Sequence, residues 1–428
     1  MKNLLFLFYV ILSASSLMAF AHPKSVEVLH WWTSGGEANA INVLKENVQK
    51  QGYIWKDAGS VLGGGGDQQR KVLHARIEAH SPPDAIMIQS NTMHNYAENN
   101  LLSSLDAIAQ QEKWKQLLSP PLQNTVMYKN HWLAIPINIH RSHWIWANKK
   151  IFDKLNIKPP RTLSELMSVS KTIQKAGYIP IAHGGQPWQD VILFDSTVLS
   201  IGGTAFYKKA LYDFNTEALG SKTMETVFEQ LRQLQSFFDK DYFNREWHLA
   251  TAMVIHEKAA MQIMGDWVKG EFIKAGKKPN QDFLCFEFPG TQNNFLFISD
   301  LFGFPIAPQK QLDGQTVLIK TMMDKKFQED FNLVKGSIPA RMDVSLERFD
   351  ECAQKSSHDF KKALKQNTAI RHFDTVISDM NRKALYKIIS DFIHNPQLSA
   401  KAATRELQRC LAASNNKNEI ASSRINCG

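Results

Sequence analysis

Several kinds of sequence feature are rare or absent in this chain of 428 residues. It has only four cysteines, and their spacing fits no zinc-binding pattern. Its 50 Lys and Arg outnumber its 41 Asp and Glu, but they never form a run longer than two residues. The net charge of +9 therefore predicts a solvated surface and no nucleic-acid partner. After the N-terminal segment, no uninterrupted apolar run approaches the roughly 18 residues of a membrane-spanning helix.

Motifs of common enzyme and cofactor sites are absent too. His256-Glu257 lacks the second histidine of a zinc protease, and no G-x-S-x-G element of a serine hydrolase occurs. The glycine run at residues 63–66 lacks the Lys-Ser/Thr of a phosphate-binding loop. We expect instead a flexible loop whose Asp67 caps the next helix, and we predict no cofactor.

Histidines and cysteines raise the questions of a metal site and of disulfides. His140 and His143 have a spacing that suits metal ligands, but no third ligand accompanies them, so we expect a structural pair and no metal. Four cysteines allow three full sets of disulfides. Because Cys352 and Cys410 both fall in the helical C-terminal part, we favour a bond between them. The other two cysteines are Cys285 and Cys427.

The N-terminus has the three parts of a secretory signal peptide. Lys2 supplies the positive charge, Leu4–Leu12 the apolar segment, and Ala19-Phe20-Ala21 the cleavage signal. We predict cleavage after Ala21 and a periplasmic mature protein, in a setting that permits disulfides. No cysteine lies near the cleavage site, so we expect no lipid anchor and no direct attachment to the membrane.

The rest of the chain alternates between strand and helix patterns, which predicts an α/β fold with a mainly parallel sheet. Its 43% hydrophobic and 21% charged residues suit two lobes with separate cores. Trp132–Ile139 contains Pro136, which indicates an edge strand or a crossing segment. Thr162 and Glu165 predict a capping box at a helix start. Other expected strands are Val26–Leu29, Tyr53–Ala58, Ala85–Ile88, Ile179–Ala182, Ala259–Met264, Phe283–Phe288 and Phe295–Ile298, and expected helices include Ala38–Gln51, Gln68–Ala79, Thr92–Glu98, Lys149–Leu155, Trp247–Lys258 and Gln315–Phe327, with a polar tail at 414–428.

Four predicted strand ends carry an aromatic ring close to a carboxylate. The first is His30-Trp31-Trp32-Thr33-Ser34-Gly35-Gly36-Glu37, and the others hold Trp188 with Asp190, Trp267 with Asp266, and Asp300 before an aromatic run. Ligands of open α/β sheets bind at the carboxyl ends of strands. A sugar suits such a site, because its C–H faces pack on aromatic rings and its hydroxyls donate to carboxylates. The alternative is that both adjacent tryptophans belong to the core and that Glu37 only starts a helix.

The same carboxylates leave an enzymatic alternative open. Two of Glu37, Asp266 and Asp300 could form the carboxylate pair of a glycosidase, which needs two carboxyl groups at a defined separation. They could equally accept hydrogen bonds from the hydroxyls of a bound sugar. The sequence does not give their separation, so both interpretations stand at this point.

Four motifs together resemble those of a known family: VEVLHWWTSGGE at 26–37, HGGQPWQD at 183–190, GDW-x-KGEF at 265–272 and KGSIPAR at 335–341. They are similar to the extracellular solute-binding proteins of ABC sugar importers, and most similar to the periplasmic glucose/mannose-binding group. The resemblance covers residues 26–410. It implies two α/β lobes with a ligand cleft between them and several hinge crossings. It also implies sugar binding without catalysis by a monomer whose partner is a membrane permease.

The resemblance further implies lobe boundaries and a set of ligand-binding residues. One lobe would consist of 22–138 and 293–333, and the other of 139–292 and 334–428. The implied ligand is a monosaccharide, glucose first and mannose second, with a disaccharide or a polyol as the alternative. Gln186 and Trp188 match a family motif and either contact the ligand or shape the second lobe. The implied ligand-binding residues are Trp31, Trp32, Glu37, Gln89, Trp267, Asp300, Lys335 and His372.

Overall fold

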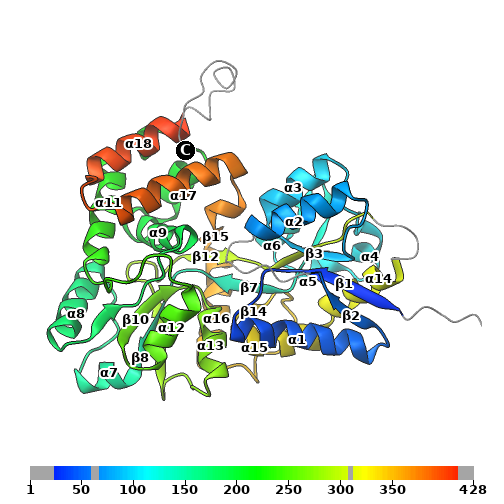
Figure 1. The fold of residues 1–428 in the computed structure, drawn as a ribbon, viewed down its shortest axis with the longest axis horizontal. Coiled ribbons are helices and arrows are strands. Elements are labelled where there is room, and N and C mark those ends of the chain that lie inside the picture. Colours follow the sequence, from blue (N-terminus) through cyan, green and yellow to red (C-terminus); the bar gives the residue numbers. More distant parts are fainter. Residues whose placement is uncertain (1–23, 59–66, 307–311, 413–428) are drawn as a thin grey trace, which may run out of the picture.

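Two α/β lobes lie side by side in the computed structural model, which describes residues 24–58, 67–306 and 312–412 (Figure 1). The N-terminal strands, in blue and cyan, belong to the first lobe, and the green middle of the chain builds the second. The expected signal peptide, the glycine run at 63–66 and the tail at 414–428 lie outside the described residues. No helix among the described residues combines the length and the apolar character that crossing a membrane requires.

A five-stranded sheet in the order β2-β1-β3-β13-β6 forms the centre of the first lobe. Strand β1 pairs in parallel with β2 and β3, whereas β13 pairs antiparallel with β3 and β6. Pro136 ends the edge strand β6, where a missing N–H costs no ladder bond, as predicted. The strands are β1 Ser25–Leu29, β2 Ile54–Asp57, β3 Ala85–Ile88, β6 Ala134–Pro136 and β13 Leu301–Gly303, and the main covering helices are α1 Gly35–Lys50, α2 Asp67–Glu78, α3 Ser90–Glu98, α14 Leu312–Met323 and α15 Lys325–Lys335.

The second lobe contains a four-stranded sheet in the order β11-β8-β10-β9. Strand β8 is antiparallel to both of its neighbours, and only β10 and β9 are parallel. The expectation of a mainly parallel sheet is therefore wrong for both lobes. Strand β8 had not been expected, because all five of its residues are buried and no alternation marks it. The strands are β8 Trp144–Asn148, β9 Ile179–Ile181, β10 Ala259–Met264 and β11 Phe283–Glu287.

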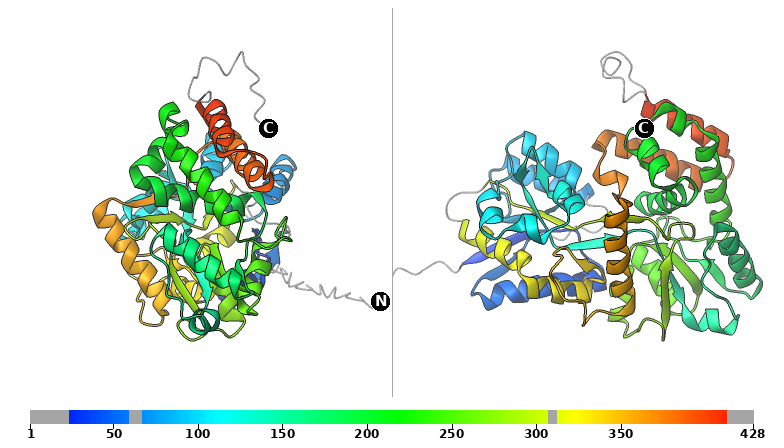
Figure 2. Two further views of the ribbon diagram at one scale, coloured as in Figure 1. Left: turned by 90° about the vertical axis from the view of Figure 1, so that its left-hand side faces the viewer. Right: turned by 180° about the vertical axis from the view of Figure 1, so that it is seen from behind.

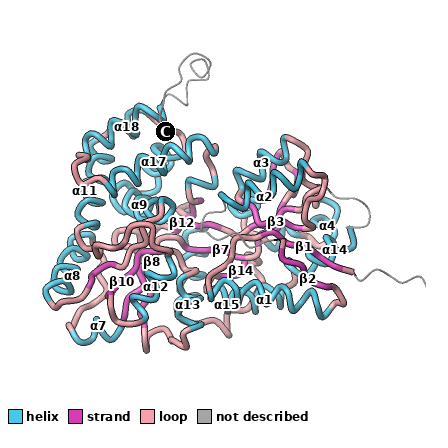
Figure 3. The backbone as a smooth tube through the Cα atoms, viewed as in Figure 1, coloured by secondary structure: helices cyan, strands magenta, loops and turns pink. Residues whose placement is uncertain are grey.

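A third sheet, in the order β14-β7-β12-β15, connects the lobes. Figure 3 shows β7, β12 and β14 between the strands of the two lobes. The chain crosses from one lobe to the other along these strands, which agrees with a two-lobe fold that has several crossings. Strands β7 and β12 of this sheet begin at or near residues 138 and 293, where we predicted two of the lobe boundaries. The boundaries themselves stay a prediction. Its strands are β7 Asn138–Arg141, β12 Phe295–Ile298, β14 Ile338–Pro339 and β15 Ala369–Arg371.

The remaining elements complete both lobes. Thr162 and Glu165 form the expected capping box of α8. The helix expected at Gln315–Phe327 is in fact broken, because the Asp324 side chain accepts from the Phe327 N–H at 2.7 Å and starts α15 there. These elements are α4 Asp106–Gln111, α5 Trp114–Leu117, α6 Pro120–Val126, β4 Met127–Tyr128, β5 His131–Trp132, α7 Lys149–Lys154, α8 Leu163–Lys175, α9 Pro187–Leu211, α10 Thr216–Leu219, α11 Lys222–Gln235, α12 Trp247–Ile255, α13 Val268–Lys274, α16 Glu351–Gln366, η2 Phe373–Thr375, α17 Asp379–His394 and α18 Ala400–Ala412.

A disulfide joins Cys285 on β11 to Cys352 on α16, so the expected bond between Cys352 and Cys410 is wrong. Cys285 and Cys352 meet in one apolar cluster of the second lobe, although 67 residues separate them. Cys410 is disulfide-bonded as well. Seen from behind, the golden-orange helix α16 runs along the junction of the lobes, so this disulfide ties the second sheet to the junction (Figure 2).

Candidate functional site

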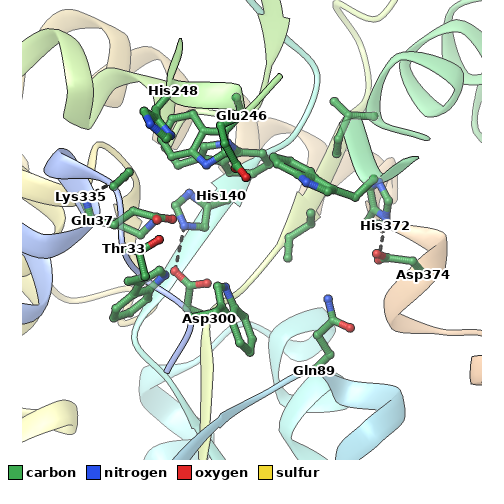
Figure 4. A pocket seen from close by; sticks show the side chains of 18 of the residues that line it. Thr33, Glu37, Gln89, His140, Glu246, His248, Asp300, Lys335, His372 and Asp374 are labelled. Atoms are coloured by element: carbon green, nitrogen blue, oxygen red, sulfur yellow. Dashed lines mark hydrogen bonds and ion pairs between the residues drawn. The ribbon is translucent and has the colours of Figure 1, made fainter. Parts of the chain in front are cut away.

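One pocket between the lobes is lined by residues from both lobes and from the connecting sheet (Figure 4). Its empty space, including the part that is open to solvent, is about 890 Å³. The fold brings together all eight residues that the resemblance implied. They are Trp31, Trp32, Glu37, Gln89, Trp267, Asp300, Lys335 and His372.

The turn between β1 and α1 forms one wall of the pocket. Ser34 is the N-cap of α1, and its hydroxyl accepts from the Glu37 N–H at 3.3 Å, which fixes the first helical turn. Trp32 is 2% exposed and packs on Phe302 and Phe331 with ring centroids 5.9 and 5.6 Å away. Trp32 is thus both a core residue and a pocket residue, so the two interpretations of this motif are not exclusive.

Two buried ionisable groups, Glu37 and Lys335, meet beside this wall. The Lys335 Nζ lies 3.6 Å from Glu37 Oε1 and 5.3 Å from the ring centroid of Trp32. Burial raises the pKa of Glu37, although the Lys335 charge acts in the opposite direction. The lysine ends α15, so the packing of α15 on α1 holds the pair together.

His140 on β7 lies between two carboxylates. Its Nδ1 contacts Asp266, and its Nε2 lies 2.9 Å from Asp300 Oδ2. Burial disfavours the charged imidazolium, but the two carboxylates outweigh burial and raise the pKa of His140. Burial would likewise raise the pKa of Asp300, yet His140, Lys335 and a 2.6 Å hydrogen bond from the Asn138 amide lower it. His140 therefore holds the pocket carboxylate Asp300 in its charged form.

His140 and Asp266 depart from their expected roles. His140, expected to be structural, lines the pocket, whereas its neighbour His143 does not. Asp266, considered as a glycosidase carboxylate, is not among the lining residues and accepts a hydrogen bond from the Arg141 N–H at 3.0 Å. Asp266 is thus a support for His140.

Tryptophans of the second lobe cover the opposite wall. The Trp267 ring meets the His140 ring edge-on with centroids 5.4 Å apart, and the Trp188 ring lies 6.2 Å from that of Trp267. Trp188 donates its indole N–H to Gln186 Oε1 at 2.9 Å. Trp188 therefore lines the pocket, whereas Gln186 holds it from behind.

His372 stands at the far end of the pocket (Figure 4). Its Nδ1 lies 2.7 Å from Asp374 Oδ1 and its Nε2 lies 2.5 Å from Asp195 Oδ2. Burial would lower the pKa of His372, but the two carboxylates raise it to about 10. Both ring nitrogens thus lie close to carboxylates, and Nδ1 also shares a hydrogen bond with Asp374. His372 and Asp374 line the pocket together with Tyr386, whose hydroxyl donates to Asp374 Oδ2 at 2.8 Å.

Gln89 extends the polar surface of the pocket from the first lobe. It is the N-cap of α3, but its side chain makes no capping hydrogen bond. Its Oε1 is buried without a hydrogen-bond partner among the described residues. Because unpaired buried polar atoms are costly, a ligand hydroxyl would satisfy this amide.

Residues 60–295, more than half of the chain, match the family model of the bacterial extracellular solute-binding proteins. The chain belongs to this family. This solute-binding protein is 42% identical over 400 residues to a probable sugar-binding periplasmic protein of Brucella melitensis, covering 93% of this chain and 94% of that one. The family resemblance that we drew from the four motifs is thereby confirmed.

Two further comparisons bear on the fold and on the glucose group. A glucose-binding protein of Saccharolobus solfataricus is 24% identical over 307 residues, covering 66% of this chain and 54% of that one, so the likeness to glucose-binding proteins is distant. A solved chitin oligosaccharide binding protein superposes with a TM-score of 0.78 at 17% identity, covering 91% of this chain and 98% of that one. That likeness confirms the two-lobe fold.

Several residues that line the pocket of the solute-binding protein are not predicted from the sequence. In Glu246-Trp247 a carboxylate also stands beside a tryptophan, as at the four predicted strand ends. This pair, however, starts helix α12 instead of ending a strand. Asp374 and Tyr386 carry no recognisable local pattern. The lining residues that we did not expect there are Thr33, Ser34, His140, Ile192, Glu246, Trp247, His248, Ile298, Asp374 and Tyr386.

Proposed function

We propose that this solute-binding protein is a periplasmic receptor that captures a monosaccharide, glucose or mannose, and delivers it to the permease of an ABC importer. The observation that carries this proposal is the convergence of Trp31, Trp32 and Trp267 with Glu37 and Asp300 on one pocket between two lobes. Aromatic faces pack on sugar C–H faces, and the carboxylates accept from sugar hydroxyls. The name of the Brucella relative and the family motifs support the same reading.

The sugar would bind to one lobe first, and closure of the other would exclude water. The ligand drives this closure only by its greater affinity for the closed form. Within the closed pocket, a polar group such as the Gln89 amide oxygen that meets no matching hydroxyl would lose water without gaining a hydrogen bond, which would select the stereochemistry of the sugar. Lys335 would donate to hydroxyls, and Glu37, Asp300 and the Gln89 amide oxygen would accept from them.

We also propose that the protein performs no chemistry on the sugar. A glycosidase needs two carboxyl groups on the two sides of the scissile bond. Asp266 stands behind His140, and Asp300 already accepts from His140 and Asn138. Purified protein should therefore leave aryl-glucosides intact. Turnover that disappears in Glu37→Gln would show instead that the site is catalytic.

Isothermal titration calorimetry on ligand-stripped mature protein tests the binding proposal. Glucose and mannose are titrated first, then galactose, xylose and maltose. We expect micromolar or tighter binding of glucose, about −8 kcal/mol or better. Glu37→Gln should weaken it roughly tenfold to a hundredfold, because a charged acceptor of sugar hydroxyls is lost.

Glu217→Gln serves as the control, since that side chain is 88% exposed on α10, and it should leave the affinity unchanged. If maltose alone bound, the proposed ligand would be a disaccharide instead of a monosaccharide. The absence of binding heat with every sugar tested would contradict the proposal.

A further inference from the structure

Four acidic side chains line the pocket, and three of them have a basic partner: Glu37 with Lys335, Asp300 with His140 and Asp374 with His372. The fourth is Glu246, which immediately precedes α12. Among the described residues, no Lys, Arg or His forms an ion pair with Glu246. Since charges that lose water need a counter-charge, Glu246 is the one lining carboxylate whose counter-charge the ligand would have to bring.

A hydrogen-bond network fixes the Glu246 carboxylate in place. The Gln186 Nε2 donates to Glu246 Oε1 at 2.8 Å. The Gln186 Oε1 in turn accepts from Trp188 Nε1 at 2.9 Å and from Gln189 Nε2 at 3.0 Å. Glu246 is therefore a half-buried acceptor in a set position, and Gln186 positions both it and Trp188.

Three tryptophans of the second lobe line the pocket that Glu246 also lines. Trp188, Trp247 and Trp267 line the same pocket, and Figure 4 shows Glu246 across it from Asp300 and Gln89. The faces of indole rings attract cations, most strongly where water is excluded. A carboxylate that has no basic partner, in a pocket lined by several indoles, therefore favours an ammonium group over a hydroxyl.

We propose that Glu246 is a specificity-determining residue that recognises an ammonium group on the ligand. Amino sugars would then bind more tightly than their neutral parents, and sugar acids more weakly. This inference rests on the proposed function as a sugar receptor. A hydroxyl can also donate to Glu246, but only a cation compensates its charge when closure removes water.

The test is calorimetry with glucose, with glucosamine and its 3-amino and 6-amino isomers, and with glucuronate, at a mildly acidic pH where the amines are protonated. We expect at least one amino sugar to bind roughly tenfold more tightly than glucose. Glucuronate should bind more weakly than glucose. The amino group that gives the gain also identifies which ring carbon faces Glu246.

Glu246→Gln keeps the shape of the side chain and an acceptor for Gln186, and it should abolish the amino-sugar gain. Glu217→Gln removes an exposed carboxylate of α10 and should keep this gain. Thermal unfolding verifies that the variants are folded. Glucose binding without any amino-sugar gain, or a gain that persists in Glu246→Gln, would overturn this inference alone. The absence of binding heat with glucose and with all other sugars would instead overturn the proposed function, on which this inference rests.

Discussion

Both ends of the pocket hold a buried histidine between two carboxylates, but the carboxylates are held differently. At the His140 end, Asp300 also accepts from the Asn138 amide and faces Lys335, and its pKa is lowered despite burial. At the His372 end, burial prevails at Asp195, and its pKa is raised. The same arrangement of charges can therefore lower or raise the pKa of a carboxylate, depending on its other partners.

The difference suits two roles. Asp300 stays charged and lines the pocket, so it can accept from a ligand. Asp195 does not line the pocket and supports His372 from behind. Asp374 also lines the pocket and has a lowered pKa, so both ends can accept from a ligand, but the His372 end in addition holds η2 and α17 together through the Tyr386 hydrogen bond. We call the His140 end the recognition end and the His372 end the supporting end.

The largest effect is expected from His140→Gln. The glutamine amide carries no charge, so Asp266 loses its basic partner and Asp300 keeps only the Lys335 charge. We expect a loss of about 3–5 kcal/mol in the free energy of unfolding, measured by chemical denaturation, together with loss of sugar binding. His131→Gln is the control, because His131 is 63% exposed and its pair with Asp106 should contribute less than about 1 kcal/mol. Equal losses in both variants would contradict the buried charge pair.

At pH 8.5, His372→Gln should lower the free energy of unfolding by about 2 kcal/mol, which is less than for His140→Gln and is the usual penalty for a buried polar group left without its partner. The pKa of Asp195 is already raised, so this carboxyl can take up a proton when the imidazolium is gone. Denaturation of both variants under the same conditions gives the comparison. A cost as large as that of His140→Gln would mean that Asp195 stays charged.

The pH dependence of stability separates the two ends further. The pKa of His372 is about 10 in the folded protein against 6.5 when unfolded. This raised pKa stabilises the fold fully below pH 6.5, and the contribution is lost as the pH rises through 10. Proton linkage therefore predicts that the free energy of unfolding falls by about 2 kcal/mol between pH 6.5 and 8.5. Denaturation curves recorded at each pH measure this fall. His372→Gln should remove this part of the fall, whereas a slope identical to that of the wild type would contradict the raised pKa.

The sequence revealed the recognition end better than the supporting end, and the reason is the distance along the chain. Trp31, Trp32 and Glu37 share one strand-to-helix turn, so a local pattern marks them. The sequence predicts a structural role for His140, since no third metal ligand accompanies it and His143, and its partners Asp266 and Asp300 follow only 126 and 160 residues later. Only the fold brings such groups together.

The His372 end shows the same limit more strongly. Asp195 lies within α9, Asp374 in η2 and Tyr386 on α17. No strand end or spacing links these elements in the sequence. The cysteines show the same limit. Cys352 forms a disulfide with Cys285, which lies 67 residues away, whereas the sequence predicted a bond to Cys410 because both fall in the helical C-terminal part. The family motifs supplied two lobes and a cleft, while the pairing of strands within each sheet depended on tertiary packing.

The lobes also touch beside each end of the pocket, and the smallest expected effects concern these contacts. Beside His372, the Asn91 amide of the first lobe donates to the Asp374 and Ile377 carbonyls at 3.0 and 3.1 Å. Near Glu37, the Gly36 N–H donates to Glu271 Oε1 of the second lobe at 2.7 Å. Such contacts favour the closed form, so losing them lowers its population and the apparent affinity by the same factor.

Asn91→Ala removes two hydrogen bonds across the lobes and should weaken sugar binding roughly tenfold. Glu271→Gln keeps an acceptor for Gly36 and loses only the charge at the N-terminus of α1, so roughly threefold is expected. Calorimetry gives both affinities, and small-angle scattering without sugar should show a more open average form for Asn91→Ala. If Glu271→Gln weakened binding more than Asn91→Ala, the contact beside Glu37 would be the one that controls closure, and the recognition end would then also set the population of the closed form.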